Sequence, residues 1–112
     1  MTTYTAGRDL DALIAEKVMK LQVIRFSGNP LVYATTKSDE DGKYLPCYST
    51  AIADAWTVVE KLGKAFEVHY REGAFSCLIE EGDEVTAHYI AEATAETAPL
   101  AICLAALKAV GA

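Results

Sequence analysis

Side chains able to take part in chemistry are few in this 112-residue chain, and its two histidines are the first to consider. His69 and His88 both lie in segments whose apolar and polar residues alternate as in a strand. If these segments flank the strand that contains Ser76, then His69, Ser76 and His88 form one row across an antiparallel sheet. Neighbouring strands lie about 4.8 Å apart, so the imidazoles would be about 10 Å from each other. That separation is too large for a shared metal ion.

The row depends on the register of the strands. We expect Tyr70 to pair with Phe75 and Ile79 with Val85, whereas a slip of one residue would move every side chain to the other face. In this register Arg71 shares the face of the row. Two interpretations are open. The row and its neighbours could line a ligand pocket or an interface, or the histidines could be half-exposed strand residues near the edge of the sheet, which is the interpretation we favour.

The three cysteines, Cys47, Cys77 and Cys103, are the other reactive side chains. They form no Cys-x-x-Cys pair, which disfavours a zinc ribbon or a thioredoxin-type site. Their small or apolar neighbours predict reduced thiols packed as small hydrophobic residues. A nucleophilic thiol needs a cationic or histidine neighbour, and the sequence offers no convincing one. Since no glycine-rich phosphate loop occurs either, we expect a protein that is not an enzyme and that needs no cofactor.

Two acidic segments have side chains that could attract a cation. Residues 39–42 (Asp-Glu-Asp-Gly) match part of a calcium-binding loop, but that alignment places Lys37 at the first ligand and Tyr48 at the closing glutamate. The match therefore fails, and no metal is predicted. Residues 80–84 are interpreted as an exposed acidic turn.

Composition narrows the class of protein. The chain is 52% hydrophobic and 23% charged, as in an ordinary globular protein, and we expect a single domain over residues 1–112. The net charge of −6 and the scattered Lys and Arg residues disfavour nucleic acid as a partner. The longest apolar run is about half the roughly 20 residues that a membrane span needs, and the N-terminus lacks the apolar segment of a signal peptide. We therefore expect a cytoplasmic protein without a membrane partner.

Three helices are predicted from apolar residues spaced three and four apart, over residues 9–21, 49–63 and 97–110. Asp9 is expected to cap the first, and Ser49 or Thr50 the second. Gly63 suits the left-handed residue that ends a helix. In the third helix Pro99 lies in the first turn, where its missing N–H has no cost.

Strands are predicted at residues 66–71, 74–79 and 85–91, with a tight turn at Glu72-Gly73, which together form an antiparallel meander. Between residues 22 and 47 the pattern is weaker. Short strands are expected near residues 23–26 and 31–35, a turn at 27–30, and a polar loop at 38–43.

The strand at residues 74–79 has apolar residues on both of its alternating faces. A sheet covered on one side only would show polar residues on the second face. The pattern therefore favours helices on both faces. We expect an α+β fold that is a three-layer α/β/α sandwich, with a mainly antiparallel sheet of about three to four strands and about three helices.

Three blocks resemble one family, the phage ABA-sandwich domain family of small bacteriophage and prophage proteins. They are GRDLDALIAEKVM (7–19), PCYSTAIADAW (46–56) and ETAPLAICLAAL (96–107). The resemblance implies helix–sheet–helix layering and a phage origin, and it brings no established reaction and no catalytic residues. The blocks also have plain structural interpretations: Tyr48-Ser49-Thr50 as a helix entry, Thr97-Ala98-Pro99 as a capped helix start, and Trp56 as a large core residue.

We therefore expect a phage-encoded, non-enzymatic binding or accessory protein that acts in the infected host cell as a homo-oligomer. The alanine-rich residues 98–109, which allow close helix contact, and the six tyrosines motivate the oligomer. One alternative is a counter-defence sponge that sequesters a host nucleotide signal. A protein–protein interaction module that uses an edge strand or a helix face to inhibit a host protein is the other. The sponge would use a basic residue for phosphates and aromatic rings for stacking, drawn from Arg25, Arg71, Tyr33, Tyr44 and Tyr70.

Overall fold

The computed structural model describes residues 5–26, 29–35, 38–44, 46–82 and 85–111, with backbone only at residue 22 and in the described parts of 24–44. Its elements follow in the order α1 (Arg8–Lys17), β1 (Gln22–Phe26), β2 (Asn29–Thr35), β3 (Ser38–Tyr44), α2 (Ile52–Leu62), β4 (Ala65–Arg71), β5 (Ala74–Glu81), β6 (His88–Ala95) and α3 (Ala98–Ala109). The α+β class, the three helices and a three-stranded antiparallel sheet were predicted, and they are confirmed.

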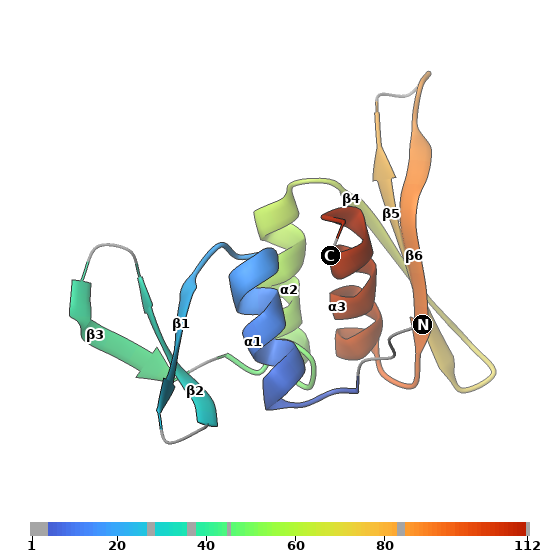
Figure 1. The fold of residues 1–112 in the computed structure, drawn as a ribbon. Helices are drawn as coiled ribbons and strands as arrows, with labels where there is room; N and C mark the ends of the chain where they lie inside the picture. Colours follow the sequence, from blue (N-terminus) through green and yellow to red (C-terminus); the bar gives the residue numbers. More distant parts are fainter. Residues whose placement is uncertain (1–4, 27–28, 36–37, 45, 83–84, 112) are drawn as a thin grey trace.

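The helices lie between two three-stranded antiparallel sheets (Figure 1). In the sheet β4–β5–β6, α3 contacts β5 and β6, and α2 and α1 pack against α3. On the other side of the bundle α1 contacts β1 and β2 of the sheet β1–β2–β3. The second helical cover expected on the far face of β4–β5–β6 does not come from the described residues of this chain. That face carries exposed side chains.

The core surrounds α3, the most buried of the three helices. Its buried residues meet the inner residues of β5 and β6, which include Cys77, Ile79, Ala91 and Ala93. Small alanines on both sides let the helix lie close to the sheet. α3 is thus largely enclosed by its own chain.

The helix ends follow the expected chemistry only in part. The Thr97 hydroxyl accepts a hydrogen bond from Leu100 N at 3.4 Å, and Gly63 adopts a left-handed φ of 64°, so both of these predictions are confirmed. The caps predicted for the first two helices are wrong. α1 begins one residue before Asp9, and the N-cap of α2 is Ala51, without a side-chain cap. Neither Ser49 nor Thr50 caps α2, since the Ser49 hydroxyl bonds to α1 instead.

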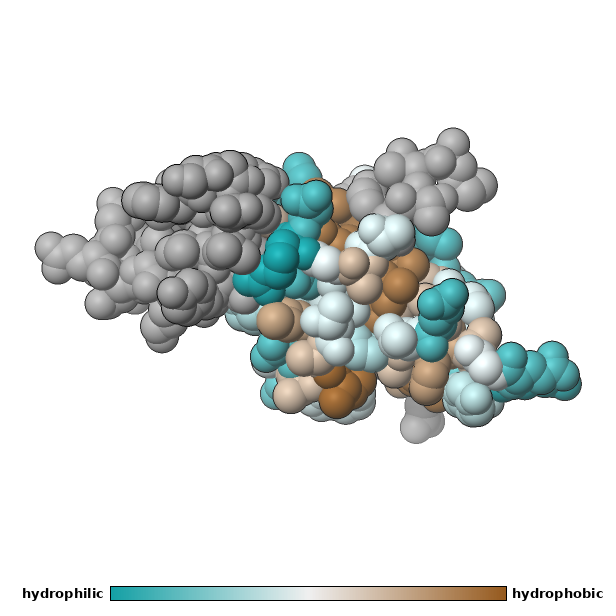
Figure 2. Space-filling view, turned by 90° about the horizontal axis from the view of Figure 1, so that it is seen from below, coloured by the Kyte–Doolittle hydropathy of each residue, from teal (hydrophilic) through white to brown (hydrophobic). Residues whose placement is uncertain are grey.

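Aromatic burial also differs from the prediction. Trp56, expected in the core, is 52% exposed, whereas Tyr48 is only 2% exposed. Trp56 lies on the face of α2 that points away from α3, since Ala55 and Val58 are the α2 residues that are fully buried. Seen from the end at which the helices begin, apolar residues form separate patches between polar ones (Figure 2).

The first sheet contains one strand that was not expected. β2 includes the predicted strand at residues 31–35, but the segment interpreted as a polar loop is β3, which pairs with β2 through Val32↔Tyr44 and Thr35↔Ser38. Backbone pairing can hold a polar strand at a sheet edge, so composition alone is a weak guide there. Of the predicted turn, residues 27 and 28 lie outside the described residues, and Asn29 and Pro30 belong to β2. In the described part of the chain, no helix is long and apolar enough to cross a membrane.

Candidate functional site

The candidate site is a groove on the face of the β4–β5–β6 sheet that the helices leave exposed. Its volume is about 520 Å³, and it is open to solvent. The residues that line it are His69, Tyr70, Arg71, Ser76, Leu78 and Glu92. Of these, the Tyr70 side chain lies on the helix side, in the row of Phe75. Four of these residues, His69, Tyr70, Arg71 and Ser76, are ones that the sequence singled out for a ligand. The strand register explains why they meet.

The β4–β5 hairpin has the predicted register. Tyr70 pairs with Phe75 and His69 with Ser76, and no irregularity interrupts the ladder. The turn residues Glu72 and Gly73 have φ values of 52° and 82°, as in the tight turn of a two-residue hairpin. This local geometry places His69 and Ser76 side by side.

The third strand has a different register from the one expected. Ile79 pairs with Ala91, not with Val85, and Ser76 pairs with Thr94. The small residues of β6, rather than Val85, lie against α3, and Val85 is 92% exposed beyond the helix. The row across the sheet is therefore His69–Ser76–Thr94, and the hydroxyl oxygens of Ser76 and Thr94 are 3.1 Å apart.

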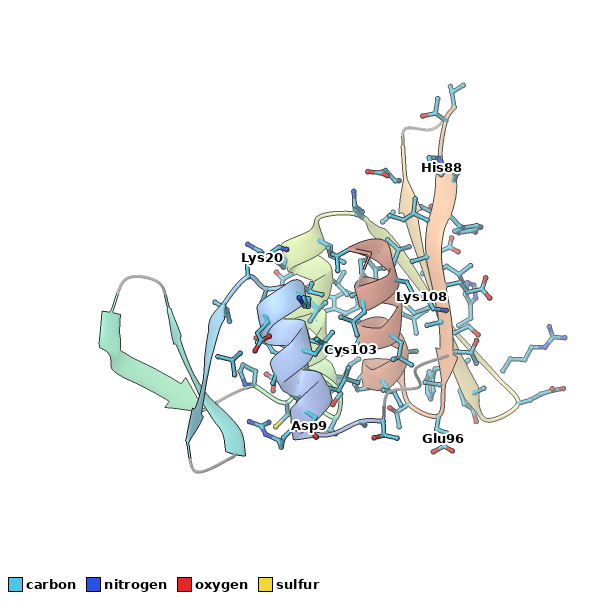
Figure 3. All side chains as sticks on the ribbon, viewed as in Figure 1. Asp9, Lys20, His88, Glu96, Cys103 and Lys108 are labelled. Carbon is cyan, nitrogen blue, oxygen red and sulfur yellow. The ribbon has the colours of Figure 1, made fainter. Side chains whose placement is uncertain are left out.

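His88 does not belong to this row, and its predicted place beside Ser76 is wrong. It pairs with Glu81, past a bulge between Ile79 and Glu80 in the β5–β6 ladder. Figure 3 shows it near the end of β6 opposite to Glu96. That position is about 20 Å along the strand from Thr94.

The charges of the outer face are arranged along the strands. Arg71 lies next to the hairpin turn and His69 one row further, while Glu67 and Glu92 share the next row with Leu78. Successive rows on one face are about 6.8 Å apart. The Arg71 guanidinium and the His69 imidazole thus occupy the hairpin end of the groove, and carboxylates occupy the other end.

The Glu67 carboxylate interacts with two neighbouring side chains. Its Oε2 accepts a hydrogen bond from the Tyr89 hydroxyl at 3.2 Å and lies 3.4 Å from His69 Nε2. The hydrogen bond to Glu67, together with the negative charge of that carboxylate, raises the pKa of Tyr89. The Tyr70 ring packs on Phe75 with centroids 4.8 Å apart, and 65% of the Tyr70 side chain remains exposed.

The other residues proposed for a ligand lie elsewhere. The side chains of Arg25, Tyr33 and Tyr44 are outside the described residues. In the described part of the chain, no three His, Cys, Asp or Glu side chains are grouped so that they could hold a metal ion.

A second polar cluster is buried where α1 meets the entry to α2. Asp11, 1% exposed, accepts hydrogen bonds from Ser49 N at 2.8 Å and Ser49 Oγ at 2.7 Å, and its second oxygen accepts from Arg8 at 3.0 Å. Sequence reasoning missed this cluster. The sequence could have indicated it, because Asp11 precedes Ile14 by three residues and Ala15 by four, and therefore lies on the buried face of the helix.

The environment of the cysteines is only partly as expected. Cys77 and Cys103 are buried free thiols, and burial raises the pKa of Cys77 to about 11 and that of Cys103 still further. Cys47, for which no cationic neighbour was expected, accepts a hydrogen bond from Arg8 Nη1 at 3.2 Å. The same guanidinium nitrogen donates to Asp11, whose negative charge offsets that of the arginine.

The model of the phage ABA sandwich domain matches residues 12–107. The chain belongs to the phage ABA sandwich domain family. A solved structure, that of a phage protein from Bacillus cereus ATCC 14579, is similar over 97% of this chain and 96% of that one, with 26% identity and a TM-score of 0.74. No curated protein sequence matches the chain.

In this phage ABA sandwich domain, residues of the sequence blocks that carry the resemblance are part of the core and of a helix cap. Tyr48 and Ser49 are buried beside α1, and Thr97 caps α3. The groove is formed mainly outside those blocks, by β4 and β5.

Proposed function

We propose that this phage-family protein is a non-enzymatic binding protein of the infected host cell cytoplasm and that it sequesters a small nucleotide in the outer groove. The observation that carries the proposal is the meeting of Arg71, His69 and Ser76 on one open groove. Its volume of about 520 Å³ lies within the range of about 300–1,000 Å³ common for small-molecule sites.

The chemistry along the groove suits a ligand with two different ends. The Arg71 guanidinium can hold a phosphate with two parallel hydrogen bonds, and His69 and Ser76 add donors beside it. At the other end the Glu92 carboxylate accepts hydrogen bonds from N–H or O–H groups. A nucleotide presents an anionic phosphate at one end and such donors on its sugar and base.

The overall charge favours a small ligand over a polymer. With a net charge of −6 the protein repels a polyanion, whose binding depends on many neutralised phosphates. One or two phosphates need only the local pair of Arg71 and His69. A counter-defence role, in which the protein removes a host nucleotide signal, requires binding without turnover.

The proposal that the bound nucleotide is not converted is supported by the contacts and protonation of the side chains that could act in catalysis. The Ser76 hydroxyl bonds to Thr94, and the His69 imidazole lies against Glu67. The Cys77 thiol, with its pKa near 11, stays protonated at neutral pH.

Isothermal titration calorimetry with cyclic mononucleotides, cyclic dinucleotides and linear nucleotides tests the proposal. We expect binding to at least one of them, at least tenfold weaker binding in Arg71→Ala and in His69→Ala, and no change in Lys61→Ala, which removes an exposed charge from α2. Absence of heat and of any thermal shift with every nucleotide would refute the ligand class. Recovery of a chemically altered nucleotide would refute the non-enzymatic role.

A second candidate, a protein-interaction module that acts on a host protein, is favoured by two exposed apolar residues on α2. Ile52 and Trp56 are one helical turn apart, and each is 52% exposed. A host protein that copurifies with the wild type, and is lost in Trp56→Ala while Arg71→Ala retains it, would favour this candidate over the groove.

A further inference from the structure

The free edge of β4 is regular and exposed. Within the described residues β4 pairs with β5 alone, and all residues of β4 except the half-buried Phe66 are exposed. Proteins usually protect such an edge with a bulge, a proline or a lysine, because its unpaired backbone groups can pair with another strand. β4 has none of these, and its ladder with β5 is uninterrupted. The opposite edge strand, β6, takes part in a ladder with a bulge.

Two apolar side chains of β4 lie on the helix side of the sheet without a helix over them. Val68 shares its row with the fully buried Cys77, yet it is 39% exposed, and Tyr70 is 65% exposed. The reason is the position of α3, which covers β5 and β6. The helix side of β4 is therefore an apolar strip at the margin of the core.

The hairpin geometry sets the direction of the backbone groups of β4. In a two-residue hairpin the residues that flank the turn, here Arg71 and Ala74, form a hydrogen-bonded pair, and bonded and non-bonded pairs then alternate. The N–H and C=O groups of Arg71, His69 and Glu67 thus point to β5. Those of Tyr70, Val68 and Phe66 point to the free edge.

The sequence of β4 is complementary to itself when it is reversed. We propose that β4 pairs antiparallel with β4 of a second copy of this chain, about a two-fold axis at Val68. Val68 then faces Val68 of the second copy, and Phe66 faces Tyr70 on the helix side. On the outer side Glu67 faces His69. The Val68 pair lies on the axis and occurs once, and each of the other two pairs occurs twice, as an isologous interface requires.

The backbone directions agree with this register. The Val68–Val68 pair and the Phe66–Tyr70 pairs are hydrogen-bonded across the interface, because the N–H and C=O groups of these residues point to the free edge. The Glu67–His69 pairs are the non-bonded ones, in which facing side chains lie closer together, so a carboxylate and an imidazole meet at the shorter distance. A slip by one residue would place Val68 opposite Glu67 or His69.

The pairing would give a continuous six-stranded sheet and would cover the exposed parts of Val68 and Tyr70. It would also bring the outer grooves of both copies onto one surface, with the Glu67 of each copy beside the His69 of the other. A dimer can form whether or not the groove is occupied, so this pairing does not depend on the nucleotide ligand.

Sedimentation velocity on the full chain tests the pairing. We expect twice the monomer mass of 12.1 kDa for the wild type. Val68→Pro removes an N–H that points to the partner, so it should give a folded monomer, whereas His69→Pro removes an N–H that points to β5 and should lower the melting temperature. A wild type that is monomeric at millimolar concentration, or a dimer that Val68→Pro leaves intact, would overturn the proposal.

A charge exchange tests the register without a change in backbone. Glu67→Lys should raise the dissociation constant of the dimer at least tenfold, and the double variant E67K/H69E should restore it because an ammonium group and a carboxylate then face each other in each pair. Glu60→Lys, which makes the same charge change on α2, is the control and should leave the constant unchanged. A double variant that dimerises no better than E67K would contradict this register.

Discussion

Ser49 Oγ donates a hydrogen bond of 2.7 Å to Asp11 Oδ1, and both side chains are buried although they are 38 residues apart in the sequence. The contact joins α1 to the entry of α2, and Arg8 completes the carboxylate's partners. A buried carboxylate is tolerated only when its oxygens are bonded in this way.

Replacement of Asp11 should therefore destabilise the fold strongly. Asp11→Ala leaves the Ser49 N–H and hydroxyl and the Arg8 guanidinium without this acceptor, and we expect a loss of about 3–5 kcal/mol in the free energy of unfolding. Urea denaturation measures it. Asp9→Ala, an exposed residue of the same helix turn, should change the free energy by less than about 0.5 kcal/mol. Equal losses in the two variants would show that the buried contact is not the cause.

The two large aromatic residues near α2 should differ in their effect on stability. Tyr48→Ala empties a buried site and should cost about 3–5 kcal/mol, whereas Trp56→Ala removes a half-exposed ring and should cost about 1 kcal/mol. Thermal denaturation of both variants checks this order. A larger loss in the tryptophan variant would place Trp56 in the core after all.

The β4–β5 turn contains a residue whose replacement should increase the stability of the fold. Glu72 has a φ of 52°, in the left-handed region that most residues avoid and that asparagine tolerates. Glu72→Asn should raise the free energy of unfolding by about 0.5–1 kcal/mol. Glu72→Gln, which removes the charge but keeps the backbone preference, should leave it unchanged. An equal gain in both variants would assign the effect to the charge.

The buried Cys77 thiol should make stability depend on alkaline pH. Its pKa is about 11 in the folded chain against an ordinary 9.0, because burial disfavours the thiolate. Between about pH 9 and pH 11 the unfolded chain therefore binds fewer protons than the folded one at this residue. Its contribution to stability is complete below pH 9 and is lost as the pH rises through 11.

Denaturation curves across that range should show a smaller fall in stability for Cys77→Ala than for the wild type. The comparison of slopes removes the contribution of lysines and tyrosines, which titrate in the same range in both proteins. Parallel curves would contradict the effect of burial on the Cys77 thiol.

The local features of this protein were predictable from its sequence. The apolar spacing located the three helices, Gly63 and Thr97 marked helix ends, and the Glu72-Gly73 turn set the register of the first hairpin. That register alone placed His69, Arg71 and Ser76 together on the outer sheet face. Such signals act between residues close in sequence, through the turn and the side-chain period of the strand.

The remaining features depended on which surfaces the chain covers after it folds. α3 lies against Ala91 and Ala93, which sets the register of β6 and carries His88 away from Ser76. The same packing leaves Trp56 and the helix side of β4 exposed. The buried Asp11–Ser49 contact likewise needs two distant segments to meet. Register across a long connection and the burial of a given face are decided by total packing, which no local pattern of residues contains.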